Sequence, residues 1–133
     1  MALKIATVTL VVDAYERGIA FYRDVLGLKL ADDIDMGGGK RWVVIEGAGG
    51  ARLLIAQADG DSQRAAIGKQ AGGRVGFFLE TDDFERDHAR LVVAGVRFLE
   101  TPRHEPYGSV AVFEDPFGNK WDLIGPKAAQ GSK

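Results

Sequence analysis

The 133-residue chain contains no cysteine, which excludes disulfides, thiolate metal sites and cysteine nucleophiles. It has no apolar run close to the roughly 20 residues that cross a bilayer, so we expect no membrane partner. Seventeen basic and nineteen acidic residues leave a net charge of -2, which argues against a nucleic-acid partner. The remaining composition, 46% hydrophobic and 27% charged, is typical of one soluble globular domain and is compatible with a cytoplasmic location.

The chain contains an internal repeat. Gly27 and Gly95 are separated by 95 − 27 = 68 positions, and the same lag relates Gly50 to Gly118. Each copy has the pattern of a strand, a helix, a glycine and then three strands, which predicts two βαβββ modules. We expect one domain at residues 1–127, with modules at about 3–57 and 74–125, a linker at 58–73 and a mobile tail at 126–133.

The first copy begins with alternating apolar residues, which predict a strand at residues 8–12. Asp13 followed by Glu16 is typical of a capping box and predicts the start of a helix. Gly27 lies where this helix would end in a left-handed residue. We expect further strands at residues 28–30, 41–46 and 52–56, with a turn at 32–40.

The second copy repeats this pattern from a strand at residues 75–80 to a helix that ends at Gly95. Asp82 and Glu85 predict a second capping box, and His88 lies on or near the stripe of the helix that packs on the sheet. We expect further strands at residues 96–99, 109–114 and 120–124, and a short helix in the linker around residues 63–67.

Two motifs carry a resemblance to a known family. They are Phe21-Tyr22-x-x-x-Leu26-Gly27 and Glu114-Asp115-Pro116-Phe117-Gly118-Asn119-Lys120-Trp121-Asp122-Leu123. Together with the repeat, they resemble the vicinal oxygen chelate superfamily, which includes glyoxalase I, bleomycin-resistance proteins, extradiol dioxygenases and fosfomycin-resistance enzymes. The resemblance implies an α+β fold in which two βαβββ modules form an incomplete barrel around a cleft. It also implies a homodimer, the common state of such proteins.

The resemblance bears on metal binding, because the metal-using members hold their ion with His, Glu or Gln at four inward-facing positions. Carried over to this sequence, those positions are Thr7, Leu54, Gly76 and Asp122. Only Asp122 is a good ligand, whereas catalytic metal sites usually have about three protein ligands. We therefore expect no cofactor. The alternative is a weakly held divalent ion, such as hydrated magnesium, bound by Asp122 and a substrate.

Strand alternation, assuming no bulge, indicates which side chains face the cleft. Two residues are candidates for catalysis, Asp122 and His104. The candidates for ligand binding come from the strands and from the loop before the seventh strand, and they are Thr7, Thr9, Trp42, Leu54, Gly76, Phe78, Glu80, Arg103, Tyr107 and Trp121. The result is a mostly apolar pocket with a few charges, as in most small-molecule sites.

Several of these candidates have two interpretations. Trp42 and Trp121 are either core residues or walls of the cleft. His104 is either an acid–base group or a solvated loop residue, and Tyr107 either closes over a ligand or belongs to a tight turn. Asp122 in an apolar cleft either takes up a proton or pairs with a cation, for which the candidates are Arg41, Arg52, Arg74 and Lys120.

Three hypotheses of function follow. The first is metal-independent binding of a small apolar or aromatic molecule, as in bleomycin-resistance-like members of the superfamily. The second is a glyoxalase-like enzyme, a lyase, isomerase or dioxygenase, that uses Asp122 with a weakly held divalent metal. The third is a structural or regulatory dimer with a vestigial pocket. The motifs are specific for the fold and do not decide between these hypotheses.

Overall fold

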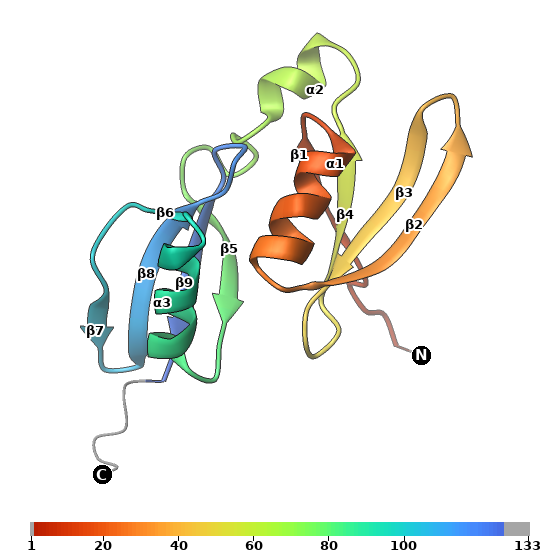
Figure 1. Ribbon diagram of the computed structural model, residues 1–133. Helices are drawn as coiled ribbons and strands as arrows, with labels where there is room; N and C mark the ends of the chain where they lie inside the picture. The colour runs from red at the N-terminus through yellow and green to blue at the C-terminus, as the bar shows by residue number, and fades with distance from the viewer. Residues whose placement is uncertain (1, 127–133) are drawn as a thin grey trace. The chain divides into compact units, whose positions relative to one another are not determined.

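The computed structural model describes residues 2–126 of the chain (Figure 1). The chain forms two compact units, Met1–Gln70 and Ala71–Lys133, and each unit contains its own sheet. The predicted α+β class with two sheet modules is thereby confirmed. Of the predicted tail at 126–133, only Pro126 lies within the described residues. No helix among residues 2–126 is long and apolar enough to cross a membrane.

The first unit has the predicted order of one strand, one helix and three strands. Its sheet has the order β1-β4-β3-β2, in which β1 runs parallel to β4 and the other pairs are antiparallel. The elements are β1 (Val8–Val12), α1 (Tyr15–Ile19), the π-helix η1 (Ala20–Val25), β2 (Lys29–Gly37), β3 (Lys40–Glu46), β4 (Arg52–Gln57) and α2 (Asp61–Ala66). The short helix expected around residues 63–67 is α2.

One face of this sheet packs on α1. Leu10, Val12 and Ile55 are fully buried there, as alternation along β1 and β4 predicts. Gly18 of α1 lies so close that a Cβ atom at this position would be 3.0 Å from Cγ2 of Ile55. The helix and the sheet therefore make contact through a residue without a side chain, and the other face of the sheet remains outside this contact.

The predicted turn at residues 32–40 is wrong, because β2 continues to Gly37. Only Gly38 and Gly39 connect β2 to β3, and their φ angles are +64° and +84°. Two consecutive positive φ values are typical of a type I′ turn, whose twist matches that of the hairpin strands. The glycine run therefore marks the tip of a long hairpin rather than a loop.

The predicted capping box at Asp13 and Glu16 is also wrong. The N-cap of α1 is Ala14, and the backbone N–H of Tyr15 donates to Oε1 of Gln57, 3.1 Å away. Asp13 instead forms an ion pair with Arg17 on the next turn. A side chain from the last strand thus satisfies the helix end, which no local pattern could predict.

The π-helix η1 explains a difference in length between the two copies. From the N-cap to the glycine there are 27 − 14 = 13 positions in the first unit and 95 − 83 = 12 in the second. In η1 the backbone N–H of Leu26 donates to the carbonyl of Phe21, five residues earlier, at 2.9 Å. A π turn therefore accommodates the additional residue. Gly27 (φ +83°) ends this helix in the predicted left-handed conformation.

The second unit repeats the plan with one additional strand. Its sheet has the order β5-β9-β8-β6, and β7 also pairs with β8. The elements are β5 (Val75–Glu80), α3 (Phe84–Val93), β6 (Arg97–Phe98), β7 (Arg103–Glu105), β8 (Gly108–Glu114) and β9 (Lys120–Gly125). The strand β7 occupies a segment predicted to be a loop, so the second module is not a strict βαβββ unit.

The face of this sheet toward α3 is aromatic. Trp121 is 3% exposed and stacks on Phe77 and Phe113, with ring centroids 4.7 and 5.8 Å away. His88 of α3 stacks on Phe84 and makes a tilted contact with Phe98, and burial lowers the pKa of its imidazole. The placement of His88 against the sheet is as predicted.

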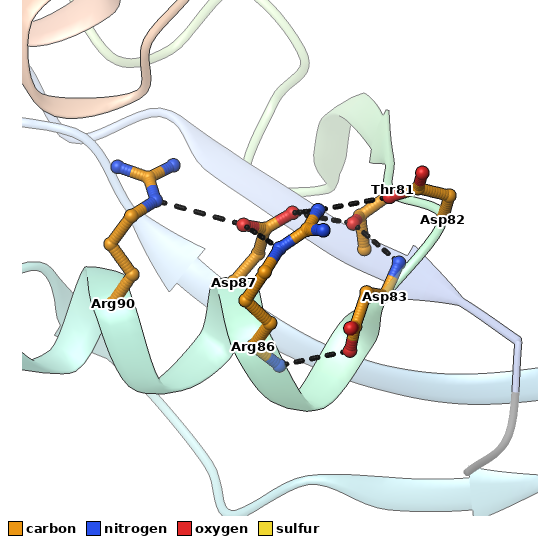
Figure 2. A network of polar contacts seen from close by, with 6 residues as sticks. All are labelled: Thr81, Asp82, Asp83, Arg86, Asp87 and Arg90. Atoms are coloured by element: carbon orange, nitrogen blue, oxygen red, sulfur yellow. Dashed lines mark hydrogen bonds and ion pairs between the residues drawn. The ribbon is translucent and has the colours of Figure 1, made fainter. Parts of the chain in front are cut away.

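The N-terminus of α3 is held by a network of polar contacts (Figure 2). Its N-cap is Asp83, not the predicted Asp82, and Oδ1 of Asp83 accepts from the backbone N–H of Arg86 at 3.1 Å. Oγ1 of Thr81 accepts from the N–H of Asp83 and donates to Asp87. The hydrogen bond from Arg86 is the main reason that the pKa of Asp87 is lowered.

The buried carboxylate of Asp115 organises the turn between β8 and β9. Its Oδ1 accepts from the backbone N–H groups of Phe117 and Asn119, at 3.0 and 2.9 Å. Its Oδ2 accepts from Nδ2 of Asn119 at 2.9 Å and from Nε1 of Trp121 at 3.0 Å. Asp115 is 4% exposed, so these four donors replace water around the carboxylate.

We expect Asp115→Ala to lower the free energy of unfolding by about 3 kcal/mol or more, because it leaves several buried donors without an acceptor. Urea denaturation followed by circular dichroism measures this loss. The control is Glu85→Ala, which removes an exposed carboxylate from α3. Equal stability of the two variants would contradict the role given to Asp115.

Candidate functional site

The open face of the first sheet is the face turned away from α1, and it contains Thr9, Trp42 and Leu54. Thr9 pairs with Leu54 in the β1–β4 register, and Leu54 lies opposite in direction to the buried Ile55. Val44 of β3 pairs with Leu54 and therefore shares its face. Trp42 lies two residues before Val44 on the same strand, so it also belongs to this face, and the Trp42 side chain is 40% exposed. Three of the predicted ligand-binding residues therefore share one face of one sheet.

A cavity of about 660 Å³ lies at this face. Its apolar lining includes Met36, Trp42 and Leu54, and its polar lining includes Thr9 and Gln63. Pockets that hold drug-sized molecules typically measure ~300–1,000 Å³ and are mostly apolar with a few polar groups. In size the cavity is suited to a small organic molecule, and its lining is mixed, because it also includes the charged residues Lys40, Arg41 and Asp59.

Arg41, one of the charged residues that line this cavity, already has partners. Arg41 forms ion pairs with Asp33 at 2.7 Å and with Glu16 at 2.6 Å. The hydroxyl of Tyr15 accepts from the backbone N–H of Arg41 at 3.1 Å. The hydrogen bonds that Arg41 donates to Asp33 and Glu16 raise the pKa of its guanidinium, so it stays charged. These groups stiffen the rim of the cavity.

The cavity also shows what the sequence analysis missed. Met36, Gln57 and Gln63 line it and were not among the candidates. Met36 belongs to the part of β2 that was predicted to be a turn, where Ile34 and Met36 continue an alternating apolar pattern. That alternation was the available signal. For Gln57 and Gln63 the sequence carries no such signal.

The open face of the second sheet, turned away from α3, contains Asp122. In the sheet register Asp122 pairs with Phe78 on one side and with Val112 on the other, and all three side chains share this face. Phe78 is 66% exposed. Oδ1 of Asp122 is buried and accepts no hydrogen bond from any residue between 2 and 126. Among the described side chains, such a buried acceptor without a donor is an exception that requires an explanation.

The electrostatic setting of Asp122 follows from this burial. Burial raises the pKa of the Asp122 carboxyl, Arg103 opposes this shift, and Glu100 adds to it. Arg103 is shared, because its guanidinium also binds Glu100 and Glu105, both at 2.9 Å. Lys120, a predicted partner, instead donates to the backbone carbonyl of Gly73 at 3.2 Å.

Other predicted site residues lie elsewhere. Trp121 belongs to the aromatic core next to α3, so the core interpretation holds for it. Gly76 lies in a β-bulge, where the register moves from Val75 opposite Lys120 to Phe77 opposite Trp121. The assumption of unbroken alternation is therefore wrong at Gly76.

The remaining candidates lie at strand ends and edges. Thr7 directly precedes β1, and Glu80 is exposed at the end of β5. His104 lies on β7, where its Nδ1 is 2.8 Å from Oγ of Ser109, a hydroxyl buried in the sheet. Tyr107 is 64% exposed in the two-residue turn between β7 and β8.

The residues at the four family metal positions do not fit a metal ion. Thr7 offers a hydroxyl, Leu54 and Gly76 offer no donor, and Asp122 offers one carboxylate. Among residues 2–126 no three His, Asp or Glu side chains are grouped so as to hold an ion. Glu100, the carboxylate that acts on Asp122, is bound to Arg103 and to the backbone N–H of Val112.

Comparison with known proteins supports the resemblance. A family profile described as Glyoxalase/Bleomycin resistance protein/Dioxygenase superfamily matches residues 4–123. A protein of Shewanella frigidimarina (strain NCIMB 400), described as uncharacterized, is 45% identical over 127 residues, which is 93% of this chain and 94% of the relative.

Two solved structures are similar along nearly their whole length. UcmS2 has a TM-score of 0.79 and 26% identity, covering 93% of this chain and 98% of its own. TnmS3, an antibiotic binding protein from Streptomyces sp. CB03234, has a TM-score of 0.75 and 28% identity, covering 96% of this chain and 99% of its own. This chain is thus similar in fold to a protein that binds an antibiotic.

We expect Asp122→Asn to raise the free energy of unfolding at pH 7 by about 1 kcal/mol, because a neutral amide costs less to bury than an unpaired carboxylate. Since the pKa of Asp122 is raised in the folded state, the wild type loses stability as the pH rises from 3.8 through that raised value. The gain should therefore be absent below pH 3.8 and appear above it.

Urea denaturation between pH 3 and 8 measures this dependence. Asp61→Asn, which changes an exposed carboxylate on α2, serves as the control and should show no such gain. A loss of stability in Asp122→Asn at pH 7 would contradict the prediction.

Proposed function

Because the chain belongs to the Glyoxalase/Bleomycin resistance protein/Dioxygenase superfamily, we propose that it binds a small apolar or aromatic molecule without a metal ion. The observation that carries this proposal is the cavity of about 660 Å³ on the open face of the first sheet. A leucine stands there at a family metal position, next to Thr9 and Trp42. The cavity therefore offers contact area rather than coordination.

Trp42 is the main contact in this proposal. Its 40% exposed indole is a large apolar surface that a flat ligand would remove from water. Aromatic pairs contribute ~0.5–1.5 kcal/mol beyond the area that they bury. The likeness to TnmS3, an antibiotic binding protein, supports a ligand of this kind.

A second candidate function is a glyoxalase-like enzyme, a lyase, isomerase or dioxygenase. The observation that favours it is the buried, unpartnered Oδ1 of Asp122, because a carboxyl with a raised pKa suits general acid–base catalysis. Of the two functions, binding has the more complete support, since His104 contacts a buried serine and the nearby Glu100 already accepts from Arg103 and from the backbone N–H of Val112. Mass spectrometry of the ligand after incubation separates binding from conversion.

The homodimer and the cytoplasmic location also remain proposals. Each sheet packs one face on its own helix, while large apolar side chains such as Ile34, Met36 and Phe78 are more than half exposed. Exposed apolar surface of this kind is typical of association sites. Cell fractionation tests the location.

We expect 2-naphthylmethanol to bind the protein with equal affinity in the presence and absence of EDTA, because no metal takes part. Trp42→Ala should weaken this binding by about tenfold, the loss of one aromatic contact and its buried area. Isothermal titration calorimetry measures both. Val93→Ala removes an 88% exposed apolar side chain of α3 and should leave the affinity unchanged. Binding that EDTA abolishes would overturn the proposal.

Sedimentation equilibrium tests the homodimer. We expect a species of twice the 14.3 kDa mass of the chain at micromolar concentration, because burial of the exposed apolar residues stabilises association. A dilution series is the control for nonspecific aggregation. A constant mass of 14.3 kDa at all concentrations would contradict dimer formation.

A further inference from the structure

We propose that Asp122 binds the ammonium group of an aromatic ligand whose ring lies against Phe78. The inference rests on the proposed function, since the occupant is again a small aromatic molecule. The inference specifies that the ligand is positively charged and that Asp122 is the residue that selects this charge.

The first step is the unpartnered oxygen. Oδ1 of Asp122 is buried and has no donor among residues 2–126. A buried acceptor without a hydrogen bond has lost its water and received nothing in exchange, which is unfavourable. Asp122 as a whole is only partly buried, so a ligand that carries an N–H donor can approach the carboxylate from the open face.

The second step is that the nearby cations are bound elsewhere. Arg103 binds Glu100 and Glu105, each at 2.9 Å, and Lys120 donates to the carbonyl of Gly73 at 3.2 Å. The only neighbour of Asp122 on β8 in register is Val112, which is apolar. The described part of this unit therefore presents no free donor to Asp122.

The third step is the local charge. Asp122, Glu100 and Glu105 contribute three negative charges, and Arg103 contributes one positive charge, so this part of the open face has a net charge of -2. Elsewhere on this face the charges of Lys120 and Glu80 are of opposite sign, and Arg97 is paired with Glu114 at 3.2 Å. A positively charged donor is favoured over a neutral one, and a ligand carboxylate is disfavoured.

The fourth step is Phe78, which is 66% exposed beside Asp122 in the β5–β9 register. An aromatic face next to a carboxylate favours a ligand that combines a ring with a cation, because the ring stacks and the cation is attracted to both groups. A lone carboxylate also suits a monovalent ammonium, whereas a divalent metal requires several ligands. The family's metal position thus becomes a site for an organic cation.

The experiment uses three probes with the same ring: 2-naphthylmethylammonium, 2-naphthylmethanol and 2-naphthoate. Isothermal titration calorimetry at pH 7 with EDTA measures their affinities for the wild-type protein and for Asp122→Asn. We expect the wild type to bind the ammonium about tenfold more tightly than the alcohol and to bind the carboxylate most weakly. In Asp122→Asn the preference for the ammonium should disappear, while the affinity for the alcohol stays within about twofold.

Glu114→Gln is the matched control. It removes a carboxylate from the same face, but one that Arg97 already binds, so the ammonium-to-alcohol ratio should not change. Phe78→Ala should weaken binding of the ammonium, because the ring of that ligand lies against Phe78.

The outcomes separate this inference from the proposed function. If the alcohol binds and Asp122→Asn keeps the full preference for the ammonium, the inference is overturned and the proposed function stands. If Glu114→Gln removes the preference as completely as Asp122→Asn, the contact with Asp122 is overturned in favour of a diffuse field. Failure of all three probes to bind would overturn both proposals.

Discussion

Each sheet of this protein packs one face on a single helix and leaves the other face open. The alternation of side chains along the strands therefore decides which residues are buried against the helix and which lie on the open face. Ile55 points to α1 and the adjacent Leu54 points away from it. In the second unit Trp121 lies in the core and the adjacent Asp122 lies on the open face. A difference of one position therefore separates residues that hold the fold together from residues that are available to a ligand.

The motif that contributes most to the family resemblance is structural. Asp115 gathers the backbone of the turn, the amide of Asn119 and the indole of Trp121 around one carboxylate, and the turn fixes the start of β9. Asp122 belongs to the same motif, but unlike Asp115 it has one buried carboxylate oxygen that accepts no hydrogen bond from the described residues. The motif thus predicts the fold without identifying the function.

Prediction from sequence succeeded where the signal was local and periodic. The repeat, the strand β5 at residues 75–80 and the left-handed Gly27 were all predictable, and so was the position of Thr9 and Leu54 on one face. It failed where a distant group decided the outcome. Gln57 rather than Asp13 satisfies the start of α1, and the bulge at Gly76 depends on how β5 pairs with β9. The position of Trp121 was undecided because its stacking partners lie on other strands.

The π turn within η1 has a consequence for how such a duplicated chain diverges. An insertion in a loop shifts nothing, whereas an insertion in an α-helix rotates all later residues by about 100° around the axis. A π turn confines that rotation to one segment, so the residues at both ends of the helix remain packed on the sheet. The two halves of the chain can therefore differ in length inside a buried element and still bury homologous faces.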